Sequence, residues 1–156
     1  MKESLLLLIL LISCNGYSQD LKITNDQEIK SVVNQFFESL ETRDTVLMRR
    51  TTSEKAQIWR RYSDENPIRF NMRFSKDDLS KMRTLPNVRE VAQDFEITER
   101  NGIAVAWVPY GFWIKEEFSH CGIDVFTLFK IDGIWKIISI AYTIEKEHCD
   151  ELMSEE

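Results

Sequence analysis

Residues 118–145 constrain the fold of this 156-residue chain more than any other stretch. Two runs rich in Val, Ile, Phe, Thr and Trp flank the dipeptide Asp132-Gly133. Glycine supplies the positive φ that a tight hairpin turn needs, so the pattern predicts two long antiparallel strands joined at this turn. Both runs are apolar at adjacent as well as alternate positions, which is typical of strands covered on both faces. The polar residues His120 and Asp124 therefore stand out within the hairpin.

A helix is predicted near the start of the domain. Asn25 and Glu28 have the spacing of a helix capping box. Six apolar residues then follow at helical spacing and predict an amphipathic helix over residues 26–41. These residues are Ile29, Val32, Val33, Phe36, Phe37 and Leu40.

The rest of the chain alternates as strands do. Residues 68–74 and 91–97 repeat apolar and polar side chains with a period of two, and Asn101-Gly102 predicts a second hairpin turn. Pro109 lies within the next strand and implies a bulge or an edge position, because proline has no N–H for the sheet. Helices followed by an antiparallel meander predict one α+β domain over residues 20–150, with an acidic tail at 151–156.

Residues 1–19 have the composition of a targeting segment. Lys2 precedes an unbroken apolar run, which is too short for a span of about 20 residues and so predicts a signal peptide. Two processing routes remain open. The stretch LISC ending at Cys14 resembles a bacterial lipobox and would make Cys14 a lipidation site, whereas Gly16 and Ser18 would suit simple cleavage after Ser18. Both routes predict an exported protein, periplasmic or lipid-anchored to the cell envelope.

Charge and motif content exclude several functions. The net charge is −6, and it stays −6 without residues 1–19, so the domain has no electrostatic reason to bind nucleic acid. The sequence has no phosphate-binding loop, nucleophile elbow or metal-ligand spacing, so neither a cofactor nor a metal is predicted. Contact with a membrane is expected only through a lipid on Cys14.

Cys121 and Cys149 are the two cysteines outside the signal segment. Their even number and the predicted oxidising compartment favour a disulfide, while two unpaired small apolar side chains are the alternative. In the predicted hairpin Cys121 faces about Ile144, and a reversal over residues 145–148 would return Cys149 toward it. We therefore predict a Cys121–Cys149 bond.

The order of elements and three stretches resemble the nuclear transport factor 2-like superfamily, and within it the SnoaL-like and lumazine-binding-like bacterial branch. The stretches are AWVPYGFW (106–113), FSHCGIDVF (118–126) and GIWKI (133–137). The resemblance implies a cone-shaped, curved antiparallel sheet wrapped around N-terminal helices, with an internal pocket. It leaves function open, because the superfamily contains both enzymes and binding modules. It also leaves a homodimer open.

The register of the strands selects candidate site residues. With two-residue turns at Asp132-Gly133 and Glu116-Glu117, His120 and Asp124 share one face with Trp107 and Trp113. Asp124 among apolar neighbours would have a raised pKa, as an acid or base requires, or would be a structural carboxylate with a hydrogen-bonding partner. His120 would be a proton shuttle, or a polar residue at the rim of the sheet.

The predicted pocket lining comprises Trp107, Tyr110, Trp113, His120 and Asp124. Tyr110 belongs to the opposite face in this register, but a bulge at Pro109 would turn it inward. Aromatic faces suit a small, partly apolar and planar ligand. Because no complete acid–base constellation is visible, the favoured function is an exported small-molecule-binding or interaction domain. The alternative is a cofactor-independent lyase, isomerase or hydrolase with Asp124, assisted by His120, as its catalytic residue.

Overall fold

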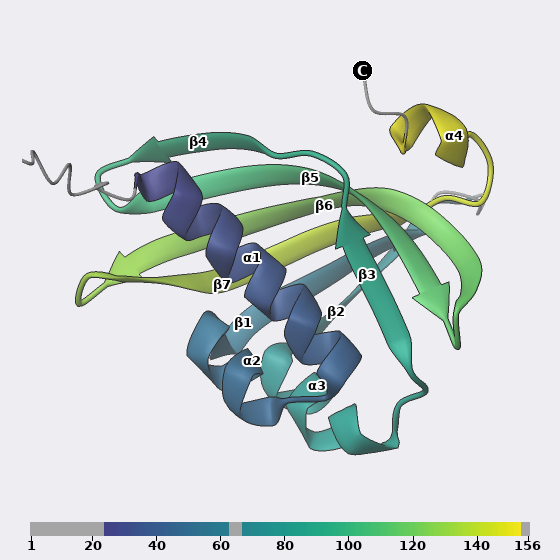
Figure 1. The fold of residues 1–156 in the computed structure, drawn as a ribbon, viewed down its shortest axis with the longest axis horizontal. Coiled ribbons are helices and arrows are strands. Elements are labelled where there is room, and N and C mark those ends of the chain that lie inside the picture. Colours follow the sequence, from purple (N-terminus) through teal and green to yellow (C-terminus); the bar gives the residue numbers. More distant parts are fainter. Residues whose placement is uncertain (1–23, 63–66, 154–156) are drawn as a thin grey trace, which may run out of the picture.

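The computed structural model describes residues 24–62 and 67–153 (Figure 1). The predicted signal segment, Cys14 and the last three residues of the predicted tail lie outside the described residues. The elements are α1 (Asn25–Thr42), α2 (Thr45–Thr51), β1 (Thr52–Tyr62), β2 (Arg69–Phe74), α3 (Ser75–Lys81), the 3₁₀ turn η1 (Met82–Thr84), β3 (Val88–Ala92), β4 (Glu96–Arg100), β5 (Ile103–Ile114), β6 (Glu117–Ile131), β7 (Ile134–Ile144) and α4 (Cys149–Leu152). This is the predicted α+β class.

Helix α1 begins one residue earlier than the sequence pattern predicts. The capping box uses Thr24 and Gln27 rather than Asn25 and Glu28: the Gln27 N–H donates to the Thr24 hydroxyl, and the Thr24 N–H donates to the Gln27 side chain. The predicted apolar face is confirmed. Its residues are either fully buried or, for Val32 and Leu40, partly buried against the core. Within the part of the chain that the structure describes, no helix has both the length and the apolar character of a membrane span.

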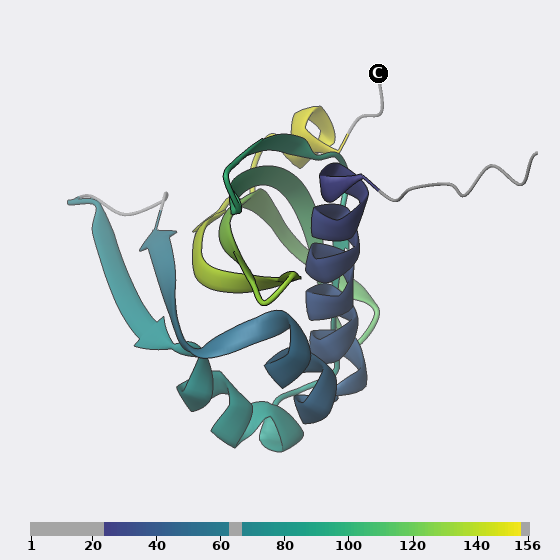
Figure 2. The same ribbon diagram turned by 90° about the vertical axis from the view of Figure 1, so that its left-hand side faces the viewer.

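The strands form one curved sheet in the order β2-β1-β7-β6-β5-β3, with β4 also paired to β5. All pairs are antiparallel except β1 and β7, which run parallel. Figures 1 and 2 show α1 lying across the concave side of this sheet, with α2 and α3 together at one end. The predicted cone-shaped arrangement of sheet and helices is confirmed, with the parallel pair as its one departure from the antiparallel pattern.

Pro109 lies opposite a break between two strands. The predicted strand over residues 91–97 is in fact divided, because β3 ends at Ala92 opposite Tyr110 and β4 begins at Glu96 opposite Trp107. Between them the Gln93 N–H donates to the Pro109 carbonyl oxygen at 2.8 Å. Pro109 therefore lies in the gap between the ends of β3 and β4, where β5 has no paired strand on this side. The lack of an N–H on Pro109 costs no sheet hydrogen bond at such a local edge.

Two irregularities correct the predicted register. The turn between β5 and β6 is Lys115-Glu116, one residue earlier than predicted, and the pairing shifts again between Phe112 and Trp113. Val108 therefore pairs with Asp124, and Trp107 pairs with Val125. Because side chains alternate along a strand, this net shift of one residue moves Trp107 and Trp113 to the outer face and brings Tyr110 inside. The prediction that the two tryptophans share a face with Asp124 is wrong.

A second irregularity lies in the hairpin of β6 and β7. The Asp132-Gly133 turn is confirmed, and Ile131 pairs with Ile134 as predicted. The register then shifts between Thr127 and Leu128, so Asp124 lies opposite Tyr142 rather than Ala141. Beyond this bulge Ile140 and Tyr142 point inward, and Ser139, paired with Thr127, does not.

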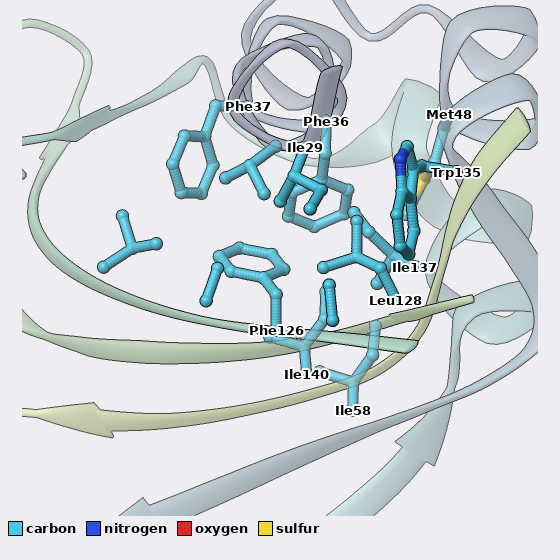
Figure 3. Packing of buried hydrophobic residues seen from close by; sticks show 14 of the residues in the cluster. Ile29, Phe36, Phe37, Met48, Ile58, Phe126, Leu128, Trp135, Ile137 and Ile140 are labelled. Atoms are coloured by element: carbon cyan, nitrogen blue, oxygen red, sulfur yellow. The ribbon is translucent and has the colours of Figure 1, made fainter. Parts of the chain in front are cut away.

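The core is built where α1 meets β6. The Phe126 ring lies edge-on to both Phe36 and Phe37, with ring centroids 5.8 and 5.7 Å apart (Figure 3). Such edge-to-face contacts add to the stabilisation from apolar burial itself. Ile29 lies about two helical turns before Phe36, packs in the same core and is fully buried.

The C-terminal segment is fixed to the outer face of the sheet. Cys121 and Cys149 form a disulfide with a Cα–Cα separation of 5.6 Å. Cys121 also forms an isolated bridge with Glu145, one residue beyond the expected neighbour Ile144. The predicted domain limit at residue 150 falls inside α4, whose following residue Met153 approaches Gly111.

Replacement of Ile29 by alanine tests the central role of α1. The change is expected to lower the free energy of unfolding by roughly 2–5 kcal/mol, because a fully buried side chain leaves a cavity. Asn34→Ala on the exposed side of the same helix is the control, with an expected effect within about 0.5 kcal/mol. Urea unfolding curves measure both. Equal effects of the two substitutions would contradict the observed packing.

Removal of the disulfide is expected to destabilise the domain. The bond spans 28 residues, and the chain-entropy model assigns such a loop roughly 3–4 kcal/mol. The double variant C121A/C149A and the reduced wild type should therefore unfold at similar, lower urea concentrations than the oxidised protein. Titration of two free thiols in denatured, unreduced protein from an oxidising compartment would show that the bond does not form.

Candidate functional site

An inner cavity of about 460 Å³ lies between the sheet, the C-terminal half of α1 and the α3–η1 segment. Its size falls in the range of small-molecule sites. Its polar lining residues are Arg60, Arg73, Asp78, Glu90, Tyr110, His120, Asp124 and Tyr142. Its apolar lining residues are Phe36, Leu40, Ile58, Met82, Leu85, Pro86, Val88, Phe112, Ile114, Ile140 and Ile144.

Strand pairing arranges the polar residues in two rows on the inner face. In the first row Arg60 of β1, Tyr142 of β7 and Asp124 of β6 are direct cross-strand neighbours. In the second row His120 of β6 lies beside Phe112 of β5, which lies beside Glu90 of β3. Cross-strand neighbours share a face, so the curvature of the sheet brings both rows toward one space.

Asp124 and Glu90 form a pair of carboxyl groups at the centre of the site. Asp124 is 3% exposed, and its side chain shares a hydrogen bond with the Glu90 side chain. Among the described residues, no N–H or O–H group donates to Asp124 Oδ2, although this atom is buried. Two carboxyl groups that share a hydrogen bond need a proton between them. The pair therefore carries at most one negative charge while it is formed.

Burial raises the pKa of both carboxyl groups. Desolvation raises the pKa of Glu90 to about 7, while the hydrogen bond from Asp124 and the charge of Arg73 oppose that rise. Desolvation and the neighbouring Glu90 raise the pKa of Asp124 well above its usual range. A carboxyl group that keeps its proton near neutral pH can donate a hydrogen bond or act as a general acid.

Arg73 closes one side of the cavity and has its own partners. Its Nε donates to both oxygens of Asp78, at 2.7 and 2.9 Å, and an Nη–H donates to the Tyr142 hydroxyl at 3.2 Å. This charge is therefore balanced within the protein. The interaction also fixes the Tyr142 ring next to Asp124, because the two residues pair across β6 and β7.

His120 is held in its neutral form by its surroundings. Its ring stacks on Phe112 with centroids 4.7 Å apart, and its Nδ1 lies 3.0 Å from the Ser119 hydroxyl. Burial, followed by the charges of Arg60 and Lys146, lowers the pKa of His120 to about 4. A neutral imidazole can both donate and accept a hydrogen bond at neutral pH.

Tyr110 is positioned by a close backbone approach. Its hydroxyl donates to the Thr143 carbonyl oxygen at 2.7 Å across the intervening strand. Gly122 allows this contact, since a Cβ there would lie 2.9 Å from the Tyr110 hydroxyl and would collide with the Thr143 carbonyl oxygen. Burial and the nearby carboxyl groups raise the pKa of Tyr110, so its ring lines the cavity as an uncharged surface.

The structure brings three of the five predicted lining residues together and excludes two. Asp124, His120 and Tyr110 line the cavity, whereas Trp107 is 50% exposed on the outer face and Trp113 packs there against Phe118 and Arg89. The predicted lining by the two tryptophans is therefore corrected, for the register reason given above. Asp124 and His120 do not contact each other directly, because they are four residues apart on β6, roughly 13 Å along the strand.

Sequence reasoning did not select Glu90, Arg60, Arg73 or Tyr142. Glu90 had a usable signal, since it stands between Val88 and Ala92 in a period-two pattern and so points to the same side as they do. The period-two pattern predicts one strand over residues 91–97, and Glu90 falls just outside it. Arg60 and Tyr142 became visible only through the parallel pairing of β1 with β7.

A second depression of about 850 Å³ lies beside the start of α1. Its charged residues include Glu28, whose carboxylate accepts hydrogen bonds from Lys130 at 2.7 Å and from Trp135 at 3.1 Å. That contact with Lys130 is chiefly what lowers the pKa of Glu28. The Glu28 carboxylate is thus already paired, whereas in the inner cavity the buried Oδ2 of Asp124 receives no hydrogen bond from the described residues. The inner cavity is therefore the stronger candidate site.

Within residues 24–62 and 67–153, no three His, Cys, Asp or Glu side chains are grouped closely enough to hold a metal ion. The inner cavity presents carboxyl, imidazole, phenol and guanidinium groups.

Comparison with known proteins shows the fold. Neither a protein-family model nor a curated protein matches the sequence. Among solved structures, an NTF2-like protein from Cytophaga hutchinsonii is similar, with 13% identity, a TM-score of 0.66 and coverage of 79% of this chain and 100% of that chain. A protein of unknown function with a cystatin-like fold from Nostoc punctiforme has 14% identity, a TM-score of 0.62 and coverage of 78% and 92%.

A third similar structure is a provisionally assigned ketosteroid isomerase from Shewanella frigidimarina. It has 20% identity, a TM-score of 0.53 and coverage of 72% of this chain and 91% of that chain. Together these similarities show that the chain has the nuclear transport factor 2-like fold, as its sequence resemblance implies.

The carboxyl pair predicts a specific pH dependence of stability. Between pH 4.5 and about 7 Glu90 ionises in the unfolded chain but stays protonated in the folded one, so rising pH weakens the folded state. Titration of His120 changes stability in the opposite direction below pH 6.5, because the pKa of this residue is lowered in the folded state. The wild type and Glu90→Gln both contain His120, so the difference between the two proteins reports on Glu90. Glu90→Gln cannot ionise and should therefore gain stability relative to the wild type as pH rises through this window.

Urea midpoints of the two proteins across the window measure this gain. Glu96→Gln on the exposed strand β4 is the matched control and should follow the wild type at every pH. A constant difference between Glu90→Gln and the wild type would show that Glu90 does not titrate as its burial requires.

Proposed function

We propose that this chain is an exported small-molecule-binding domain of the nuclear transport factor 2-like superfamily. The observation that carries the proposal is the inner cavity, in which buried Asp124 and its partly buried partner Glu90 face a space lined mainly by apolar and aromatic side chains. A burial of this kind costs stability unless a partner satisfies the polar atoms. A bound ligand would supply a partner for Asp124 Oδ2.

The lining favours a small, partly apolar and planar ligand. Phe36, Phe112 and the ring of Tyr142 offer flat apolar surfaces, while few polar groups converge on the space. The protonated carboxyl pair would donate a hydrogen bond to a carbonyl or hydroxyl oxygen of that ligand.

The proposals of export and of a more specific branch of the superfamily rest on the sequence alone. The apolar run of residues 5–12 and the lipobox-like Cys14 support a periplasmic or envelope-anchored protein. The stretches at 106–113, 118–126 and 133–137 support the SnoaL-like and lumazine-binding-like branch. A homodimer is compatible with both.

The carboxyl pair also favours a second candidate, a cofactor-independent lyase, isomerase or hydrolase. A proton held between Asp124 and Glu90 could be transferred to or from a substrate in the cavity, because burial brings the pKa of Glu90 to about 7. The two carboxyl groups would then be catalytic residues, with neutral His120 as a further hydrogen-bonding group.

Native mass spectrometry of the purified mature domain tests the binding proposal. We expect a small-molecule adduct in the wild type, and a reduced adduct fraction in Asp124→Asn, because the amide changes the hydrogen bonds offered by the pair. Asp132→Asn in the exposed hairpin turn is the matched control and should retain the adduct. An adduct unaffected by Asp124→Asn would place the ligand elsewhere.

The same variant separates the two candidate functions. If the copurified molecule is converted by the wild type, Asp124→Asn should still bind it while losing turnover, since only proton transfer is removed. A molecule that is bound and released unchanged supports the binding domain alone.

A further inference from the structure

Arg60 is a charged residue of the inner cavity whose guanidinium group lacks a carboxylate partner in the described structure. It lies on β1 between Ile58 and Tyr62, in the alternating positions that face inward. Its Nε is buried, and no group of the described residues accepts a hydrogen bond from it. A buried N–H without an acceptor is costly, and its cost is larger on a charged group.

The other arginine of the cavity differs in this respect. Arg73 donates to both oxygens of Asp78, so its charge is neutralised inside the protein. Arg60 instead lies over the Tyr62 ring, with 4.1 Å between the guanidinium carbon and the ring centroid. Stacking on a ring face fixes the plane of a guanidinium group but leaves its N–H groups free to donate at the edge.

Two basic side chains stand near His120 at the Arg60 end of the cavity. The charges of Arg60 and Lys146 both act on His120, which is neutral there. The carboxyl pair does not offset them fully, since Asp124 and Glu90 share a hydrogen bond and hence a proton. Arg60 and Asp124 are each next to Tyr142 in register, so their Cα atoms are separated by two strand spacings, roughly 10 Å.

We propose that the ligand is an anion: a planar apolar molecule with one carboxylate or similar oxyanion, which Arg60 binds. The apolar body would lie between Phe36 and Phe112, and the far end would reach the carboxyl pair. The inference rests on the proposed function of the cavity and adds the charge class of its ligand. Arg60 is well suited to this role, because guanidinium groups bind carboxylates through parallel hydrogen bonds.

Three matched probes test the charge class by isothermal titration calorimetry near neutral pH: 2-naphthoate, 2-naphthamide and 2-naphthylmethylammonium. They share one flat ring system and differ chiefly in the charge of the attached group. We expect the wild-type mature domain to bind 2-naphthoate more tightly than 2-naphthamide by roughly tenfold or more, with the cation weakest.

The variant Arg60→Gln should lose this preference, so that it binds 2-naphthoate and 2-naphthamide with similar affinity. Arg60→Lys keeps the charge and should retain part of the preference. Arg61→Gln is the control, because Arg61 is the next residue of β1 and is exposed on the outer face. It should bind all three probes as the wild type does. Circular dichroism of each variant confirms that it is folded.

Equal binding of acid and amide by the wild type, or a preference that survives Arg60→Gln, would overturn the role of Arg60 and leave the binding function standing. In the second case Arg60 would serve only to stack on Tyr62. Binding of none of the three probes to a folded wild type would contradict the proposed function as well.

Discussion

The packing of α1 on the concave side of the sheet is the interaction on which the rest of the structure depends. Phe36 and Phe37 enclose the Phe126 ring, and Ile29 extends this contact toward the N-terminal end of the helix. The helix therefore fills the part of the sheet that ends in the Asp132-Gly133 turn. At the other end only Phe36 and Leu40 of α1 reach the lining, and the inner cavity occupies the space that remains.

The polar residues of the inner cavity lie among apolar side chains on the inner face of the sheet. Asp124 and Glu90 lie among the apolar lining residues of α1 and η1, and desolvation raises the pKa of both groups. The protein keeps these carboxyl groups at a cost to its own stability, which natural proteins accept chiefly at functional sites. The arrangement of the core thus explains the electrostatics of the site.

The sequence was sufficient for the fold and only partly for the site. Helical spacing in residues 26–41 and the Gly133 turn are local signals, so they predicted α1 and the β6–β7 hairpin correctly. The shifts at Phe112/Trp113 and Thr127/Leu128 have no local signal, because a bulge depends on packing against neighbouring strands. The shift at Phe112/Trp113 changes which β5 side chains share the inner face with Asp124, which is why Trp107 and Trp113 were misplaced. The shift at Thr127/Leu128 changes the faces of β7 residues and leaves Asp124 on the same face as Phe126.

The other residues of the site could not be predicted, because they come from segments that lie far apart in the sequence. Arg60 and Asp124 meet the same cavity only because β1 pairs with β7, a parallel contact between residues 52–62 and 137–144 that no turn encodes. Glu90 required the division of one predicted strand into β3 and β4. Long-range pairing of this kind follows from the whole fold and not from any one segment.

The placement of the tryptophans has a consequence for spectroscopy. All four indole rings lie outside the lining of the inner cavity: Trp59, Trp107 and Trp113 belong to the outer face, and Trp135 is buried near the start of α1. Tryptophan emission from this protein should therefore report on unfolding and on the outer surface while remaining largely silent about an occupant of the cavity. The phenol rings of Tyr110 and Tyr142 are the native chromophores that an occupant would touch.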